Sequence, residues 1–156
     1  MTIIEEGGAL PAIDLATPTG ERLNLRDYVG KIFVLYFYPK DDTSGCTREA
    51  QDFSSHYAEF QALGAAVLGV SRDTPAKHQK FIDKYDLTVP LATDDSDAAM
   101  QAFGVWVEKK LYGKTYMGID RSTFLFDAAG ILVRDWRKVK VPGHVVDVLE
   151  AVRALG

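Results

Sequence analysis

The stretch that decides the fold is Ile32-Phe33-Val34-Leu35-Tyr36-Phe37-Tyr38-Pro39-Lys40-Asp41-Asp42-Thr43-Ser44-Gly45-Cys46. Its apolar and aromatic beginning, from Ile32 to Tyr38, is typical of a buried central strand. A loop that contains proline and glycine follows. Beyond Cys46, apolar residues recur every three or four positions up to Gly64, which predicts a helix with a glycine C-cap. The order strand, loop, helix therefore places Cys46 in the first turn of a helix.

Cys46 is the only cysteine of the chain, which excludes a disulfide, a dithiol pair and a cysteine-built metal cage within one molecule. The first turn of a helix has unpaired N–H groups and the positive end of the helix dipole, so it favours a thiolate over a thiol. This effect alone is small. Lowering the pKa of a thiol from ~8.5 to ~6 raises its thiolate fraction at pH 7 roughly 30-fold, but weakens each thiolate about 13-fold as a nucleophile.

Fast chemistry at Cys46 therefore needs neighbouring groups that orient and polarise the electrophile. The hydroxyl of Thr43, three residues earlier, can both donate and accept hydrogen bonds. The backbone N–H groups of Gly45 and Cys46 are further candidate donors.

The pattern Pro39-x-x-x-Thr43-x-x-Cys46 fits the active-site signature of the peroxiredoxins, and Tyr38 to Glu49 most resembles their bacterioferritin-comigratory, or peroxiredoxin Q, branch. Further similarity lies in Phe103 to Lys109, in Tyr112-Gly113-Lys114 and in Gly118 to Leu125. Together with the order of elements, the resemblance covers nearly the whole chain.

The resemblance implies a thiol peroxidase that uses no metal and no organic cofactor. Cys46 would attack the terminal oxygen of hydrogen peroxide or an organic hydroperoxide and become a sulfenic acid. Thr43 would hydrogen-bond the peroxide and the thiolate, and Pro39 would shield the pocket. Arg121 would place its guanidinium beside the sulfur, and Glu49 would orient that arginine.

The chain departs from its relatives because it has no second cysteine. Many members of the branch carry a resolving cysteine five residues after the first, where this chain has Gln51. Others carry it in the next helix, but residues 76–85 contain none. We therefore expect a one-cysteine form, reduced by an external thiol: a small thiol or a thioredoxin- or glutaredoxin-type protein. The resembling branch is mostly monomeric, so a monomer is expected.

The rest of the chain predicts alternating strands and helices. The expected elements are strands over 65–71, 89–92, 122–126 and 131–136, and helices over 75–85, 97–103 and 143–155, with Thr74 as an N-cap and a turn at 127–130. The resemblance to peroxiredoxins implies a further small hairpin over 11–25, ahead of this core. A long segment without predicted structure separates residue 103 from residue 122. This order describes an α/β, thioredoxin-like fold with an N-terminal β-hairpin extension and a central mixed sheet flanked by helices.

Composition predicts one domain over residues 1–156, with 47% hydrophobic and 26% charged residues and no linker. The N-terminus lacks a charged region followed by an apolar stretch, and no run approaches the ~18 apolar residues of a membrane span. We therefore expect a cytoplasmic location without membrane attachment, which suits a lone reactive thiol. The net charge of -4 argues against nucleic acid as a partner.

Several polar residues receive structural interpretations. Asp41-Asp42 and Asp94-Asp95-Ser96-Asp97 lack the pattern of a calcium loop and are expected to cap turns and helices. His56 lies ten residues from Cys46, about 15 Å along a helix, too far to be its general base. His78 and His144 fall near predicted helix starts and are expected at the surface.

Two other functions of a single reactive cysteine are alternatives to the peroxidase. A cysteine-dependent hydrolase or phosphatase would need an arginine in a phosphate loop after the cysteine, and the spacing of Arg48 does not supply it. A thioredoxin-fold peroxide sensor or binding module without turnover would oxidise Cys46 once and then stop, even with excess thiol present.

Overall fold

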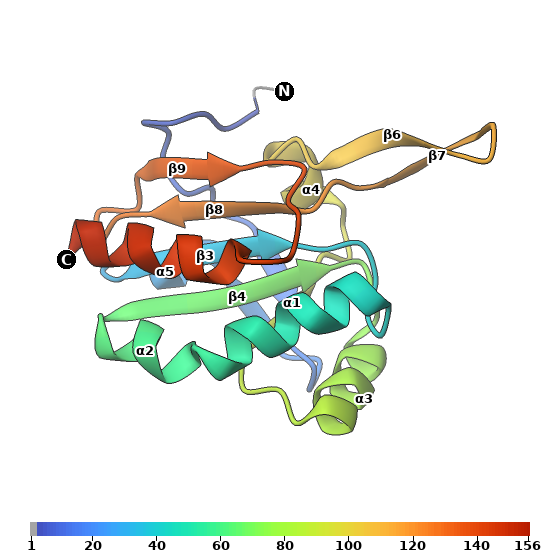
Figure 1. Cartoon of the computed structure of the whole chain (residues 1–156). Helices are drawn as coiled ribbons and strands as arrows, with labels where there is room; N and C mark the ends of the chain where they lie inside the picture. The colour runs from blue at the N-terminus through green and yellow to red at the C-terminus, as the bar shows by residue number, and fades with distance from the viewer. Residues whose placement is uncertain (1–2) are drawn as a thin grey trace.

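The computed structural model describes residues 3–156 as a mixed β-sheet covered by helices on both faces (Figure 1). The sheet has the strand order β2-β1-β5-β4-β3-β8-β9. Its strands are β1 Asp14–Ala16, β2 Arg22–Asn24, β3 Ile32–Phe37, β4 Ala65–Ser71, β5 Leu91–Thr93, β8 Ser122–Phe126 and β9 Leu132–Trp136. The central strands β3, β4 and β5 run parallel, while β1, β2, β8 and β9 pair antiparallel with their neighbours.

The helices lie between the strands along the chain, and the last helix ends it. They are α1 Ser44–Ser55, α2 Tyr57–Ala62, α3 Pro75–Tyr85, α4 Ala98–Ala102 and α5 His144–Leu155, with a short 3-10 helix over Leu25–Tyr28. Helices α1, α2 and α5 pack on one face of the sheet (Figure 1). Helix α4 and the segment before β1 pack on the other face.

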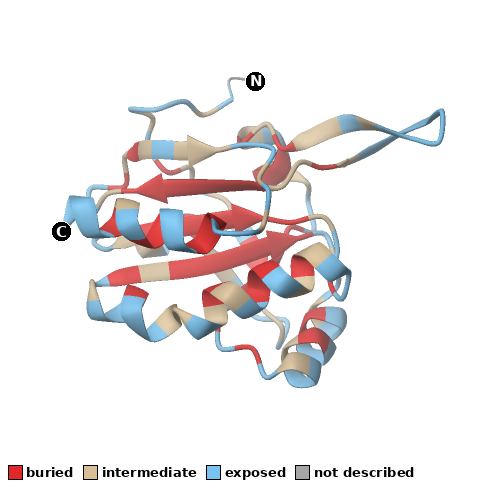
Figure 2. Cartoon of the chain, in the orientation of Figure 1, coloured by how far each residue is buried: buried red, intermediate tan, exposed pale blue. Residues whose placement is uncertain are grey.

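Strand β3 is the centre of both cores because its side chains alternate between the two faces. Tyr36 points to the core that contains Phe53 of α1, while Phe37 points to the core that contains Phe103. The strands β3, β4, β5 and β8 are buried along most of their length, whereas each helix is buried on one side only (Figure 2). This continuous apolar strand fixes the loop that leaves its end, which carries the predicted reactive residues.

Most of the predicted elements are confirmed, including the N-terminal hairpin of β1 and β2. Helix α3 begins and ends where predicted, with Pro75 at its first position and the side chain of Thr74 accepting a hydrogen bond from the Lys77 N–H. The predicted helix after Cys46 is interrupted, since α1 ends at Ser55 and α2 begins at Tyr57. The β5 strand lies slightly later than predicted, at Leu91–Thr93.

The structure adds two strands to the segment between residues 103 and 122, for which the sequence predicted no helix or strand. This segment forms a hairpin of β6 Trp106–Leu111 and β7 Lys114–Ile119 that projects from the body of the molecule (Figure 1). Its two-residue turn, Tyr112-Gly113, has positive φ angles of 51° and 77°, the geometry of tight hairpins. Most of its side chains are exposed, so it lacks the apolar pattern by which strands are predicted.

The prediction that His78 and His144 lie at the surface is wrong. His78 is fully buried and His144 is 5% exposed. The Nε2 atom of His144 lies 2.8 Å from the Thr123 hydroxyl, and burial lowers the pKa of His144 to about 4. Both rings gain their partners from strands distant in the sequence, which the local sequence pattern does not reveal.

The packing of β3 against β4 generates a stability prediction. A Cβ atom at Gly69 would lie 2.5 Å from Cζ of Tyr36, whose side chain is fully buried in the core. We expect Gly69→Ala to lower the free energy of unfolding by about 1–3 kcal/mol, because the added methyl group overpacks the core. Urea denaturation measures this loss. In a Tyr36→Leu background the same substitution should cost clearly less, and equal costs in the two backgrounds would contradict the interpretation.

Candidate active site

Cys46 lies in the first turn of α1, as predicted. The helix begins at Ser44, and its first backbone hydrogen bond runs from the Thr47 N–H to the Thr43 carbonyl at 2.8 Å. The N–H groups that precede this bond point out of the helix start and favour negative charge beside them. Cys46 itself is 1% exposed, so its sulfur faces the interior of the site and not bulk solvent.

Arg121 joins the sulfur to a buried carboxylate. Its Nη2 donates to Cys46 Sγ at 3.4 Å, and its Nη1 donates to Glu49 Oε1 at 2.7 Å. Cys46 and Glu49 are three residues apart on α1, so their side chains lie on neighbouring turns of the same face. Arg121 comes from the short connection between β7 and β8. The planar guanidinium can hold both groups at once, which the single charge of a lysine cannot do.

The close approach of this arginine depends on Gly45. A Cβ atom at Gly45 would lie 3.0 Å from Nη2 of Arg121, tighter than side chains normally pack. The absence of a side chain at this position therefore leaves room for the guanidinium beside the helix start.

The charges in the site are strongly coupled. Burial raises the pKa of Glu49 to about 7, although the positive charge and hydrogen bond of Arg121 oppose that rise. Burial alone would lower the pKa of Arg121, but the negative charges of Glu49 and Cys46 outweigh it and raise that pKa. Arg121 therefore stays charged, while Glu49 titrates near neutral pH.

Thr43 and Pro39 lie in the loop between β3 and α1. The hydroxyl of Thr43 is exposed and donates a hydrogen bond to the Lys40 carbonyl at 2.9 Å. No hydrogen bond joins it to Cys46 within residues 3–156, so the contact that the resemblance implied between Thr43 and the thiolate is not seen. Because its proton is engaged by Lys40, the hydroxyl oxygen is left with lone pairs that can accept a hydrogen bond.

Pro39 forms part of the wall of a cavity of about 400 Å³ between the active-site loop, α3 and the β6–β7 hairpin. Three lysines line this cavity, namely Lys40, Lys77 and Lys109, together with the half-buried ring of Trp106. None of the three lysines makes an ion pair with any of the residues that the structure describes. The prediction missed this cavity because one of its walls belongs to the unpredicted hairpin.

Lys109 is half-buried in the wall of this cavity and interacts with the charges of the active site. Burial lowers the pKa of Lys109, and the charges of Asp120, Arg121 and Cys46 act on it as well. The cavity is therefore lined by more positive than negative side chains, since Asp73 is the only acidic residue among its described lining residues, beside Arg72 and the three lysines.

Within residues 3–156, no group of three or more histidine, cysteine, aspartate or glutamate side chains is arranged to hold a metal ion. Among the same residues, none of the helices combines the length and the apolar character needed to cross a membrane.

The buried carboxyl group makes stability depend on pH. The pKa of Glu49 in the folded protein, about 7, lies above its ordinary value of 4.5, so folding favours the protonated form. The contribution of Glu49 to the free energy of unfolding is complete below pH 4.5 and is lost as the pH rises through 7, a change of about 3 kcal/mol. We expect Glu49→Gln to remove this part of the pH dependence in denaturation curves collected from pH 4 to 8. The matched variant of an exposed residue, Glu108→Gln, should keep it, and parallel curves for wild type and Glu49→Gln would contradict the assignment.

The sequence is similar to known proteins over most of its length. The sequence matches the AhpC/TSA family over residues 7–134. It is 49% identical to peroxiredoxin Bcp of Bacillus subtilis over 150 residues, covering 96% of each chain. It is 44% identical to peroxiredoxin Bcp of Xanthomonas campestris over 152 residues, covering 97% of this chain and 95% of the relative.

Solved structures show the same thioredoxin-like architecture. The bacterioferritin comigratory protein of Xanthomonas campestris superposes with a TM-score of 0.87 at 43% identity, covering 94% of this chain and 98% of the other. A cysteine-to-serine mutant of Xylella fastidiosa PrxQ gives a TM-score of 0.92 at 37% identity, with coverage of 99% and 98%. These likenesses extend over nearly the full length of both partners. The chain therefore belongs to the AhpC/TSA family and is a peroxiredoxin of the Bcp/peroxiredoxin Q branch.

Proposed function

We propose that this peroxiredoxin reduces hydrogen peroxide and alkyl hydroperoxides through the sulfur of Cys46. The observation that carries the proposal is the guanidinium of Arg121, 3.4 Å from the sulfur and held in place by buried Glu49. The structure of the Xanthomonas campestris bacterioferritin comigratory protein was described in terms of alkyl peroxide reduction. That description supports alkyl hydroperoxides as one substrate class for this chain.

In the proposed reaction the Cys46 thiolate attacks the terminal oxygen of the peroxide. A sulfur–oxygen bond forms as the oxygen–oxygen bond breaks, and the bonding pair leaves on the second oxygen, which takes up a proton to give water or an alcohol. Arg121 favours the thiolate and stabilises the negative charge that moves along the breaking bond. The lone pairs of Thr43 accept from the peroxide O–H, and the N–H groups at the start of α1 donate to its oxygens. Pro39 limits the access of water to the loop.

The resulting sulfenic acid must be reduced by another molecule. Peroxiredoxin Q of Xanthomonas campestris has been solved as two mutants in which different cysteines are replaced by serine, so that relative has at least two cysteines. This chain has only Cys46. An external thiol therefore has to attack the sulfenic sulfur, releasing water and forming a mixed disulfide, which a second thiol then reduces to free Cys46.

We propose that this external reductant is a small thiol that carries a negative charge. The sulfur of Cys46 is nearly inaccessible, so a bulky protein thiol would first have to displace the surrounding loop. The attacking group is a thiolate, whereas a peroxide substrate is neutral. The unpaired lysines of the adjacent cavity, Lys77 and Lys109 among them, are thus suited to attract the reductant. Such a cycle belongs in a reducing compartment, which agrees with the expected cytoplasmic location.

Peroxide turnover tests the assignment of the reactive residues. We expect Cys46→Ser to abolish peroxide consumption in the presence of dithiothreitol, and to abolish the sulfenic acid that dimedone traps in the wild type. Arg121→Lys should slow the oxidation of Cys46 by roughly 10- to 100-fold, because a lysine cannot contact the sulfur and Glu49 together. The exposed Arg134→Lys is the matched control and should be unaffected. Persistent turnover by Cys46→Ser would refute the assignment, and turnover that stops after one equivalent of peroxide would indicate a sensor.

A thiol series tests the reductant. Cys46 is first oxidised with one equivalent of peroxide, and its reduction is then followed with 3-mercaptopropionate, 2-mercaptoethanol and cysteamine, compared at equal thiolate concentrations. We expect the anionic thiol to be fastest and the cationic thiol slowest, with a difference of roughly tenfold at low salt that shrinks as salt is added. Replacing both Lys77 and Lys109 with glutamine should remove the preference, whereas Lys31→Gln should retain it. Equal rates for the three thiols, or much faster reduction by thioredoxin or glutaredoxin, would contradict a small anionic reductant.

A further inference from the structure

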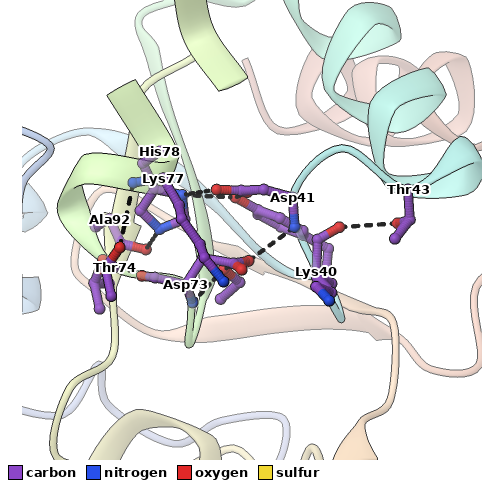
Figure 3. Close-up of polar contacts among 11 residues, drawn as sticks. Lys40, Asp41, Thr43, Asp73, Thr74, Lys77, His78 and Ala92 are labelled. Carbon is purple, nitrogen blue, oxygen red and sulfur yellow. Dashed lines mark hydrogen bonds and ion pairs between the residues drawn. The ribbon is translucent and has the colours of Figure 1, made fainter. Parts of the chain in front are cut away.

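A buried cluster of Tyr38, Asp41 and His78 lies beside the active-site loop but outside the reactive centre. His78 is carried by α3 and is completely buried, and Tyr38 and Asp41 are 1% and 8% exposed. Asp41 Oδ1 accepts a hydrogen bond from the Tyr38 hydroxyl at 2.5 Å, and Asp41 Oδ2 lies 2.7 Å from His78 Nδ1. Figure 3 shows this contact between the loop and α3. The proposed reaction gives none of these three side chains a role.

The partners of His78 define where its protons lie. Its Nε2 lies 3.0 Å from the carbonyl oxygen of Ala92, which can only accept, so Nε2 carries a proton. A second proton lies between Nδ1 and the carboxylate of Asp41, where a hydrogen bond of 2.7 Å requires one. The pair is therefore neutral overall and satisfied on both sides. Removing the ring would leave Asp41 Oδ2 buried without a hydrogen-bond partner, so the contact stabilises the position of the loop against α3.

The backbone of Asp41 is held as well. Its N–H donates to Asp73 Oδ2 at 2.8 Å (Figure 3). The same oxygen accepts a hydrogen bond from the Ser71 hydroxyl at 2.7 Å. Both the side chain and the main chain of Asp41 are therefore hydrogen-bonded to residues outside the active-site loop.

These contacts reach the active site through one peptide group. The Asp41 N–H that donates to Asp73 and the Lys40 carbonyl that accepts from Thr43 are the two ends of the same planar peptide. Fixing the N–H therefore fixes the direction of the carbonyl, and the carbonyl fixes the direction of the Thr43 hydroxyl. Thr43 has no other side-chain hydrogen bond among the described residues, and its side chain does not cap α1.

We propose that His78 is a positioning residue for peroxide reduction, which acts through Asp41 on the hydroxyl of Thr43. The inference rests on the proposed role of Thr43 in holding the peroxide. His78 touches neither the peroxide nor the sulfur. It holds the loop so that the lone pairs of the hydroxyl are presented to the substrate before the substrate arrives.

The experiment measures the second-order rate constant for oxidation of Cys46 by hydrogen peroxide in single-turnover mixing, with thermal unfolding followed in parallel. We expect His78→Gln to lower the rate constant by roughly 10- to 100-fold, since a glutamine cannot bind Asp41 and Ala92 together and small displacements of a positioned group are costly. The control is Gln79→Ala, an exposed neighbour on the same helix, which should leave the rate constant unchanged.

A double-mutant cycle separates positioning from a general loss of stability. In a Thr43→Val background, His78→Gln should produce no further loss, because the group through which it acts is already gone. A folded His78→Gln with the wild-type rate constant, or losses that multiply in the double variant, would overturn the proposal. If wild-type Cys46 itself is not oxidised by peroxide, the proposed function fails instead, and this outcome is distinguished by the wild-type measurement alone.

A second pair of variants covers the case in which His78→Gln does not fold. Asp73 is only half-buried and anchors the same peptide from its other side. Asp73→Ala should lower the rate constant and show the same absence of further loss with Thr43→Val. Asp73→Asn keeps an acceptor oxygen for the Asp41 N–H and should restore most of the rate, and equal rates for Asp73→Ala and wild type would also overturn the proposal.

Discussion

The guanidinium of Arg121 is shared between a sulfur and a carboxylate, and the rest of the site is arranged around that sharing. Cys46 and Glu49 are both buried on α1, and one cation contacts both of their side chains. Burying an ionised group is costly unless it is paired and hydrogen-bonded. The fold meets this requirement by bringing the connection between β7 and β8 against the first two turns of α1. Gly45 makes the approach possible because it has no side chain to obstruct the guanidinium.

The local sequence was sufficient to predict the elements that carry the site. Each of the signals involved spans only a few residues. The apolar run of β3 and the spacing of apolar residues after Cys46 correctly place Cys46 at the start of a helix that follows a buried strand. In the same way, Thr74 and Pro75 correctly predict the start of α3. Only the resemblance to peroxiredoxins points to Arg121, because nothing in the local sequence distinguishes this arginine from others in the chain. Its contact with the sulfur spans 75 positions of sequence.

The features that the sequence did not predict are those that depend on distant partners or on weak patterns. The β6–β7 hairpin is largely exposed, so its strands show no apolar alternation. His78 and His144 look like ordinary polar residues near helix starts, yet Asp41, Ala92 and Thr123 supply buried hydrogen-bonding partners for them. Only the assembled sheet brings those groups together. The cavity beside Pro39 was missed for the same reason, since the hairpin supplies part of its wall.

The pairing of Arg121 with Glu49 also depends on pH. Burial raises the pKa of Glu49 to about 7, so the carboxyl group carries its full negative charge only above neutrality. Burial of a carboxylate is costly unless it is paired, and the guanidinium at 2.7 Å is the partner that limits this cost. The same guanidinium lies 3.4 Å from the sulfur of Cys46, so protonation of Glu49 leaves more of its positive charge uncompensated beside the sulfur. A carboxyl group that does not contact the sulfur can in this way alter the charge that the sulfur experiences.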